Sequence, residues 1–175
     1  EVDDAESIRA IHRALDLGVT FLDTADVYGA GHSERVLARA LEGRTHEVVV
    51  ATKFGNTYDE EHRRITGTDA SPAYIRRACE ASLRRLDRDY IDLYQFPLNG
   101  FPVEEAGPVR ETLERLVEEG KIRAYGWSTD FADAARFFAA GEHCATTQVQ
   151  MNVLDDAPDI VAVCEEQGLG CINRG

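Results

Sequence analysis

The chain has 175 residues, 43% of them hydrophobic and 29% charged, which is enough for one globular domain with a sizeable core. Its formal net charge of −13 argues against a nucleic-acid-binding protein, which needs a basic face. No apolar run approaches the ~20 residues of a membrane span, and four cysteines without ligand spacing predict reduced thiols in a cytoplasmic protein.

Helix-like and strand-like segments alternate along the whole chain. Helical spacing, caps and stop signals predict helices over 5–17, Ser33–Gly43, Ser71–Leu86, Pro108–Gly120, about 131–140, and Pro158–Gln167. Short apolar runs predict strands over 19–22, 48–52, 91–96, 122–127, 147–151 and 169–172. A long loop is expected over 55–70. This alternation predicts right-handed parallel βα units.

Two architectures fit such units, an open doubly wound sheet and part of a (β/α)8 barrel. The nucleotide-binding open sheet usually carries G-x-G-x-x-G after its first strand, and this chain has no such motif. Polar residues near the carboxyl ends of five strands favour the barrel, because those ends share one face there. They are Asp23, Lys53, Ser128-Thr129, Gln148 and Asn173-Arg174.

Three of the polar residues form a chemically suggestive trio. A phenol can act as a general acid if a nearby cation lowers its pKa, which is normally about 10. Asp23, Tyr28 and Lys53 could supply the anchoring carboxylate, the phenol and the cation. Lys53 and Lys121 are the only lysines in the sequence, against seventeen arginines. The chain otherwise uses arginine, so a lysine at a strand end indicates that an amine is needed there. The pKa of an amine can shift, whereas that of a guanidinium cannot shift usefully.

Five stretches in order make the chain resemble the aldo-keto reductases, a family of (β/α)8 barrels that reduce carbonyls with NADPH. The stretches are Asp23–Gly29, Ala51–Gly55, Ile91–Gln95, Gly120–Arg123 and Gly126–Ser128. The resemblance covers residues 1–175 as one partial barrel domain. It implies about six βα units, with the first and eighth strands and the last two helices absent.

The resemblance also implies a mechanism. Tyr28 would protonate the carbonyl oxygen of a small-molecule aldehyde or ketone, Lys53 would lower the pKa of the phenol, and Asp23 would pair with Lys53. NADPH is the implied cofactor. The residues that the resemblance places against it are Asp23, Ser128, Thr129, Gln148 and Arg174.

Two positions depart from the family pattern. A histidine that binds the substrate carbonyl usually follows the fourth strand, and here Pro97 stands there, without a side-chain donor. Arg174 stands where many relatives stack an aromatic ring on the nicotinamide. We expect impaired chemistry, and His62 is more readily a solvated loop histidine than a substitute donor. We also expect the isolated segment to bind NADPH weakly and to associate through open sheet edges.

Other functions remain open on the sequence. The departures at Pro97 and Arg174 suit a degenerate relative that binds cofactor as a regulatory protein without efficient chemistry. Lys53 could instead form a Schiff base in a lyase or isomerase barrel. A metal enzyme is disfavoured because no His/Asp/Glu cluster has ligand spacing. Substrate specificity is expected to come partly from the loop over 55–69.

Overall fold

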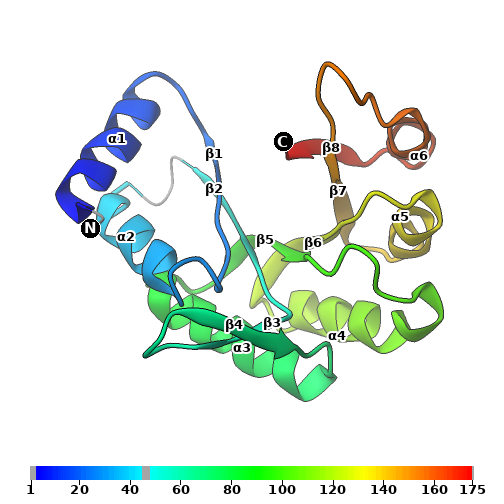
Figure 1. Ribbon diagram of the computed structural model, residues 1–175, viewed down its shortest axis with the longest axis horizontal. Helices are drawn as coiled ribbons and strands as arrows, with labels where there is room; N and C mark the ends of the chain where they lie inside the picture. Colours follow the sequence, from blue (N-terminus) through cyan, green and yellow to red (C-terminus); the bar gives the residue numbers. More distant parts are fainter. Residues whose placement is uncertain (1–2, 45–47, 175) are drawn as a thin grey trace.

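The computed structural model describes residues 3–44 and 48–174, and its centre is a six-stranded parallel sheet with the order β1-β2-β5-β6-β7-β8 (Figure 1). The strands are β1 (Phe21–Asp23), β2 (Val49–Lys53), β5 (Ile91–Phe96), β6 (Ile122–Ser128), β7 (Cys144–Gln150) and β8 (Gly170–Arg174). Their order follows the chain without reversal, whereas a doubly wound sheet reverses at a switch point. The predicted incomplete barrel is therefore confirmed.

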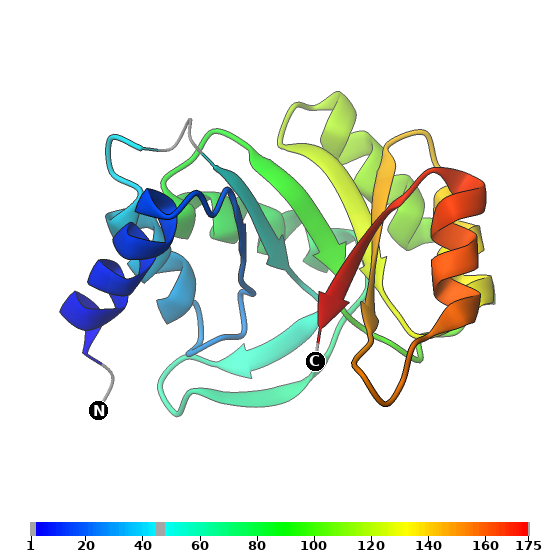
Figure 2. The same cartoon turned by 90° about the horizontal axis from the view of Figure 1, so that it is seen from above.

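Helices cover the outer, convex side of this sheet, which is strongly curled (Figures 1 and 2). They are α1 (Asp4–Asp16), α2 (His32–Ala40), α3 (Pro72–Leu86), α4 (Gly107–Glu118), α5 (Ala132–Ala139) and α6 (Pro158–Gln167). A helix lies in the chain between each two consecutive strands of this sheet, as parallel crossovers require. Strands β1 and β8 are the two edges of the sheet. The expected association of the isolated segment through these edges stays a prediction.

Local signals explain where two helices begin. The hydroxyl of Ser71 accepts a hydrogen bond from Tyr74 N, and Pro72 is the first residue of α3, as predicted. The expected cap at Ser33 is wrong, because α2 begins one residue earlier and Gly31 caps it at φ 80°. A Cβ on Gly31 would lie 2.5 Å from Arg85 Cδ, so the close approach of α3 also favours glycine there.

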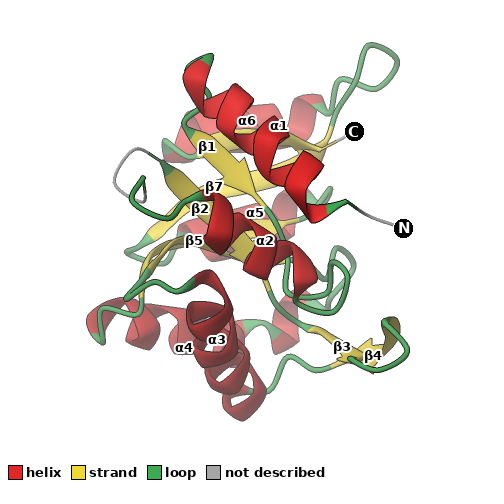
Figure 3. Ribbon diagram, turned by 90° about the vertical axis from the view of Figure 1, so that its left-hand side faces the viewer, coloured by secondary structure: helices red, strands yellow, loops and turns green. Residues whose placement is uncertain are grey.

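The loop expected over 55–70 contains an antiparallel hairpin instead. Its strands are β3 (Asn56–Asp59) and β4 (Arg64–Thr68), joined by a charged turn (Figure 3). The pairing includes Tyr58 opposite Ile65 and a register shift beside Tyr58. Most residues of these strands are polar or glycine, so they lack the apolar alternation expected of a strand with one buried face. Strand β4 is exposed, and β3 is half-buried.

The core lies between the sheet and the helices. Its largest buried rings include Phe54, Tyr94, Phe96, Trp127 and Phe138, which stack or tilt against one another with centroids 4.4 to 6.1 Å apart. Successive side chains of a strand point to opposite faces, so the residues between these rings face the interior of the curl. No helix within the described residues is long and apolar enough to cross a membrane.

Candidate active site

The side chains of Asp23 and Lys53 meet at the carboxyl ends of two neighbouring strands. Lys53 Nζ donates to Asp23 Oδ2 at 2.6 Å and to the carbonyl oxygen of Thr24 at 2.9 Å. The Lys53 side chain is only 7% exposed. Burial lowers the pKa of Lys53, the charge of Asp23 opposes this, and the charge of Arg174 lowers it slightly further. The structure therefore joins two of the three residues that the sequence singled out.

Two glutamines complete the environment of the Asp23 carboxylate. Gln95 Nε2 donates to Asp23 Oδ1 at 2.9 Å, and Gln148 Nε2 donates to Asp23 Oδ2 at 3.2 Å. Gln148 belongs to β7, which three strands separate from β1 in the sheet. A contact between them requires the curl, so this polar group fills the interior of the half-barrel. The sequence reading missed Gln95, although its polar side chain stands out in an apolar strand.

Tyr28 lies on the turn that follows β1 and is 50% exposed. The ammonium of Lys53 lies 5.8 Å from the centroid of its ring. Burial raises the pKa of the phenol, the charge of Asp23 raises it further, and Arg174 lowers it. The net direction is upward, opposite to the lowering by Lys53 that the resemblance implies. The structure places Tyr28 beside the other two residues, with its phenol protonated at neutral pH.

Ser128 and Thr129 are neighbours in sequence, but their hydroxyl groups contact different parts of the structure. Ser128 Oγ donates to Gln148 Oε1 at 3.1 Å, so it joins the polar group in the interior. Thr129 is fully buried, and its hydroxyl donates to the carbonyl of Asn99 at 3.1 Å while accepting from Phe131 N at 3.2 Å. The structure therefore brings Ser128 and Gln148 together as expected, but uses the Thr129 hydroxyl to fasten two loops.

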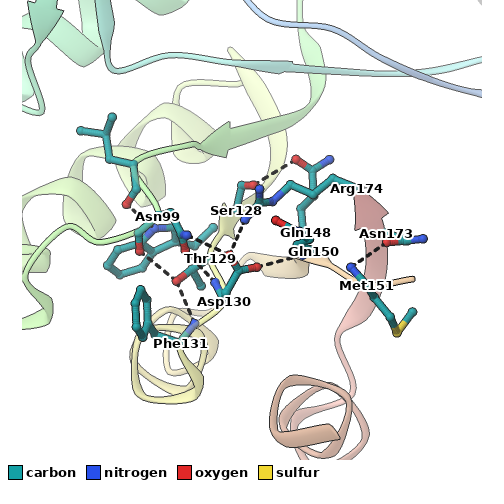
Figure 4. Close-up of polar contacts among 12 residues, drawn as sticks. Asn99, Ser128, Thr129, Asp130, Phe131, Gln148, Gln150, Met151, Asn173 and Arg174 are labelled. Carbon is teal, nitrogen blue, oxygen red and sulfur yellow. Dashed lines mark hydrogen bonds and ion pairs between the residues drawn. The ribbon is translucent and has the colours of Figure 1, made fainter. Parts of the chain in front are cut away.

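Arg174 ends β8 and reaches toward Ser128 and Gln148 (Figure 4). Its Nη2 lies 2.7 Å from Asp130 Oδ2, and its Nε is buried without a partner among the described residues. Asp130 also accepts from Asn99 Nδ2 and from Gln150 N, both at 2.8 Å. The carboxylate thus fixes the guanidinium at the carboxyl end of the sheet, close enough to Tyr28 and Lys53 to affect both.

Pro97 and His62 supply no hydrogen-bond donor to this group. Pro97 directly follows β5 and supplies no donor. His62 lies on the turn of the hairpin, where its Nδ1 is 2.8 Å from Asp59 Oδ2 and its side chain is 60% exposed. The structure therefore does not bring His62 to the Asp23–Lys53 pair.

Comparison with known proteins identifies relatives over almost the whole chain. The model of the aldo/keto reductase family matches residues 1–175. An uncharacterized oxidoreductase of Bacillus subtilis is 33% identical over 172 residues, which are 97% of this chain and 55% of that protein. A probable aldo-keto reductase of Glycine max is 36% identical over 178 residues, covering 98% of this chain and 49% of that protein.

Solved structures agree with these matches. An aldo-keto reductase from Bacillus halodurans, in its holo form, superposes with a TM-score of 0.92 at 33% identity, covering 100% of this chain and 58% of that one. An aldo/keto reductase from Klebsiella pneumoniae in complex with NADP and acetate superposes with a TM-score of 0.78 at 34% identity, covering 96% and 56%. The chain thus spans about half the length of the relatives it matches.

Proposed function

Because the chain belongs to the aldo/keto reductase family, we propose that the protein containing it reduces an aldehyde or ketone to an alcohol with NADPH. One observation carries this proposal. The Asp23 carboxylate holds the Lys53 ammonium at 2.6 Å, and that ammonium lies 5.8 Å from the Tyr28 ring. An acid, a cation and an anchoring anion are thereby gathered at the face where barrels build active sites.

In this mechanism Tyr28 gives its phenolic proton to the carbonyl oxygen of the substrate. Its raised pKa keeps the phenol protonated and available until the oxygen gains electron density. The Lys53 ammonium then stabilises the phenolate that remains, and Asp23 keeps the ammonium in place. The proton is restored from solvent after the alcohol leaves, since Tyr28 is half exposed.

The interior residues suit the carboxamide of a nicotinamide. Gln148 Oε1 keeps a second lone pair after accepting from Ser128, and its amide nitrogen keeps a second hydrogen after donating to Asp23. The partnerless Nε of Arg174 adds a further donor nearby. When bound, NADPH supplies the hydride for the carbonyl carbon. The NADP complex of the Klebsiella pneumoniae relative supports this cofactor.

Substituting Tyr28→Phe in the full-length protein tests the proposal. We expect turnover of a simple aldehyde, followed by NADPH oxidation, to fall by about 10²- to 10⁴-fold because the general acid is lost. NADPH binding, measured by fluorescence titration, should remain. The matched control is Tyr90→Phe, whose ring lies against Arg88 and Arg123. Unchanged turnover in Tyr28→Phe would rule out the proposed acid.

A second function is favoured by Pro97, which offers no donor where a substrate carbonyl would need one. Losing one such donor typically costs on the order of 10²–10³ in rate. The protein would then bind NADPH as a sensing or regulatory subunit. Single-turnover mixing of the NADPH complex with aldehyde separates the two functions, because rapid oxidation of the bound cofactor contradicts the regulatory one. In either function the four free thiols suit a reducing compartment such as the cytoplasm.

A further inference from the structure

Gln95 is the last but one residue of β5 and stands in register with Lys53 of the neighbouring strand. Its side chain is fully buried in the interior of the half-barrel. Burying an amide without hydrogen-bond partners costs more free energy than a typical hydrogen bond contributes to stability. Buried amides are therefore nearly always hydrogen-bonded. Its Nε2 finds one partner, Asp23 Oδ1, at 2.9 Å.

The two oxygens of Asp23 have different partners. Oδ2 accepts from both Lys53 and Gln148, whereas Gln95 is the partner of Oδ1 among the hydrogen bonds of the described residues. The terminal torsion of an aspartate is broad and soft, so each hydrogen bond to its oxygens narrows the range of that torsion. A donor on Oδ1 from a third strand adds to the two donors on Oδ2 in fixing the carboxylate.

The amide of Gln95 is oriented in a way that is unfavourable for its oxygen atom, Oε1. A carboxylate only accepts hydrogen bonds, so Nε2 must face Asp23 and Oε1 must face away. Oε1 is then buried without a partner among the described residues. Such a group typically marks a site where strain or function outweighs local stability. Methionine or leucine would fill a similar volume without this cost, yet neither could hold Asp23.

We propose that Gln95 is a positioning residue that locks the Asp23 carboxylate against Lys53, and so sets the charge and place of the lysine beside Tyr28. The proposal rests on the carbonyl reduction proposed above. Gln95 acts through Asp23 and touches no reacting atom. Its contribution is to the geometry of the site, because a small displacement of a catalytic group can lower the reaction rate strongly.

Two substitutions in the full-length protein test this role. Gln95→Met removes the donor and keeps the volume, and we expect kcat to fall by about 10- to 100-fold with little change in KM for NADPH. Gln95→Glu can still donate to Asp23 when its carboxyl is protonated, but repels Asp23 when ionised. Its turnover relative to the wild type should therefore be highest at low pH and fall as pH rises.

The control for simple destabilisation is Thr112→Val on the outer helix α4. It removes another buried side-chain hydrogen bond, from Thr112 Oγ1 to Pro108 O. We expect it to lower the melting temperature without changing the pH profile. A Gln95→Met protein with kcat within about twofold of wild type, or a Gln95→Glu deficit that is the same at every pH, would overturn the proposal.

A second measurement does not depend on turnover. Acetic anhydride labels unprotonated amines, and mass spectrometry can compare Lys53 with Lys121, the other lysine of this chain, as an internal reference. Attraction to Asp23 raises the pKa of Lys53, so loosening Asp23 should increase labelling of Lys53 relative to Lys121 by about twofold or more in Gln95→Met. An unchanged ratio contradicts the proposal. If the wild type shows no turnover, the proposed reduction fails, while this ratio still decides the role of Gln95.

Discussion

Arg174 and Asp130 form an ion pair of 2.7 Å that ties the end of β8 to the loop after β6. Because Asn99 and the backbone of Gln150 also bind this carboxylate, the pair anchors the guanidinium to the loop after β5 and to the end of β7 as well (Figure 4). The cation consequently sits in a fixed place, near enough to Tyr28 and Lys53 to affect the pKa of both.

Replacing Arg174 should change the pH dependence of the reaction. Arg174 lowers the pKa of both Tyr28 and Lys53, since a cation favours phenolate and disfavours ammonium. Arg174→Leu should therefore shift the alkaline limb of the kcat/KM profile to higher pH. Arg174→Lys keeps the charge and is expected to resemble the wild type more closely. An alkaline limb that stays in place in Arg174→Leu would contradict an electrostatic role for this residue.

Ser128 and Thr129 form a matched pair for separating cofactor binding from stability. Ser128→Ala leaves Gln148 Oε1 without this donor, so KM for NADPH should rise by about 3- to 10-fold in addition to some loss of stability. Thr129→Val leaves Asn99 O and Phe131 N without their partner, so it should destabilise the protein by about 1–3 kcal/mol. Steady-state kinetics measure the change in KM, and urea unfolding measures the change in stability. A raised KM for NADPH in Thr129→Val, together with an unchanged KM in Ser128→Ala, would show that Thr129 faces the cofactor.

Glu34 should be essential for stability. It is fully buried on α2, and its two oxygens accept from Arg85 Nε and Thr52 Oγ1, both at 2.6 Å. Glu34→Ala leaves a largely buried guanidinium and a buried hydroxyl unpaired, so we expect a loss of about 3–5 kcal/mol in urea unfolding. The exposed pair of Arg76 and Glu119 provides the control, because Glu119→Ala should cost about 1 kcal/mol or less. Equal losses in the two variants would contradict this account.

Asp26 should make stability depend on pH. Burial, helped by the charge of Glu34, raises the pKa of Asp26 from 3.8 to about 7, and Arg85 only partly opposes this. Between these values the folded state binds more protons than the unfolded state, so the free energy of unfolding falls as pH rises from about 4 to about 7. Asp26→Asn abolishes this ionisation and should be more stable than wild type at pH 8, by roughly 4 kcal/mol at most.

Urea unfolding at several pH values measures this effect. The exposed Asp89→Asn serves as a control with little expected effect at any pH. Parallel curves for wild type and Asp26→Asn would show that Asp26 is not a buried acid. Since Asp26 lies two residues before Tyr28, the same titration would report on the turn that carries the proposed general acid.

The sequence predicted the elements well where patterns are local. Apolar runs bounded by glycine and proline located six strands, and helical spacing located six helices, with ends displaced by a few residues at most. The hairpin at Asn56–Asp59 and Arg64–Thr68 escaped prediction because, apart from Tyr58 and Ile65, its paired residues are polar or glycine. Such a strand lacks the apolar alternation that burial of one face produces.

Strand ends and residue types can be read along the chain, and they were enough to predict the incomplete barrel and to single out Asp23, Tyr28 and Lys53. The polar neighbours that share the interior with them became visible in the folded structure. Gln95 and Gln148 lie 72 and 125 residues from Asp23, and Ser128 and Thr129 face opposite ways. Curl and packing decide which face of each strand turns inward, and these depend on contacts between distant segments that no local pattern records.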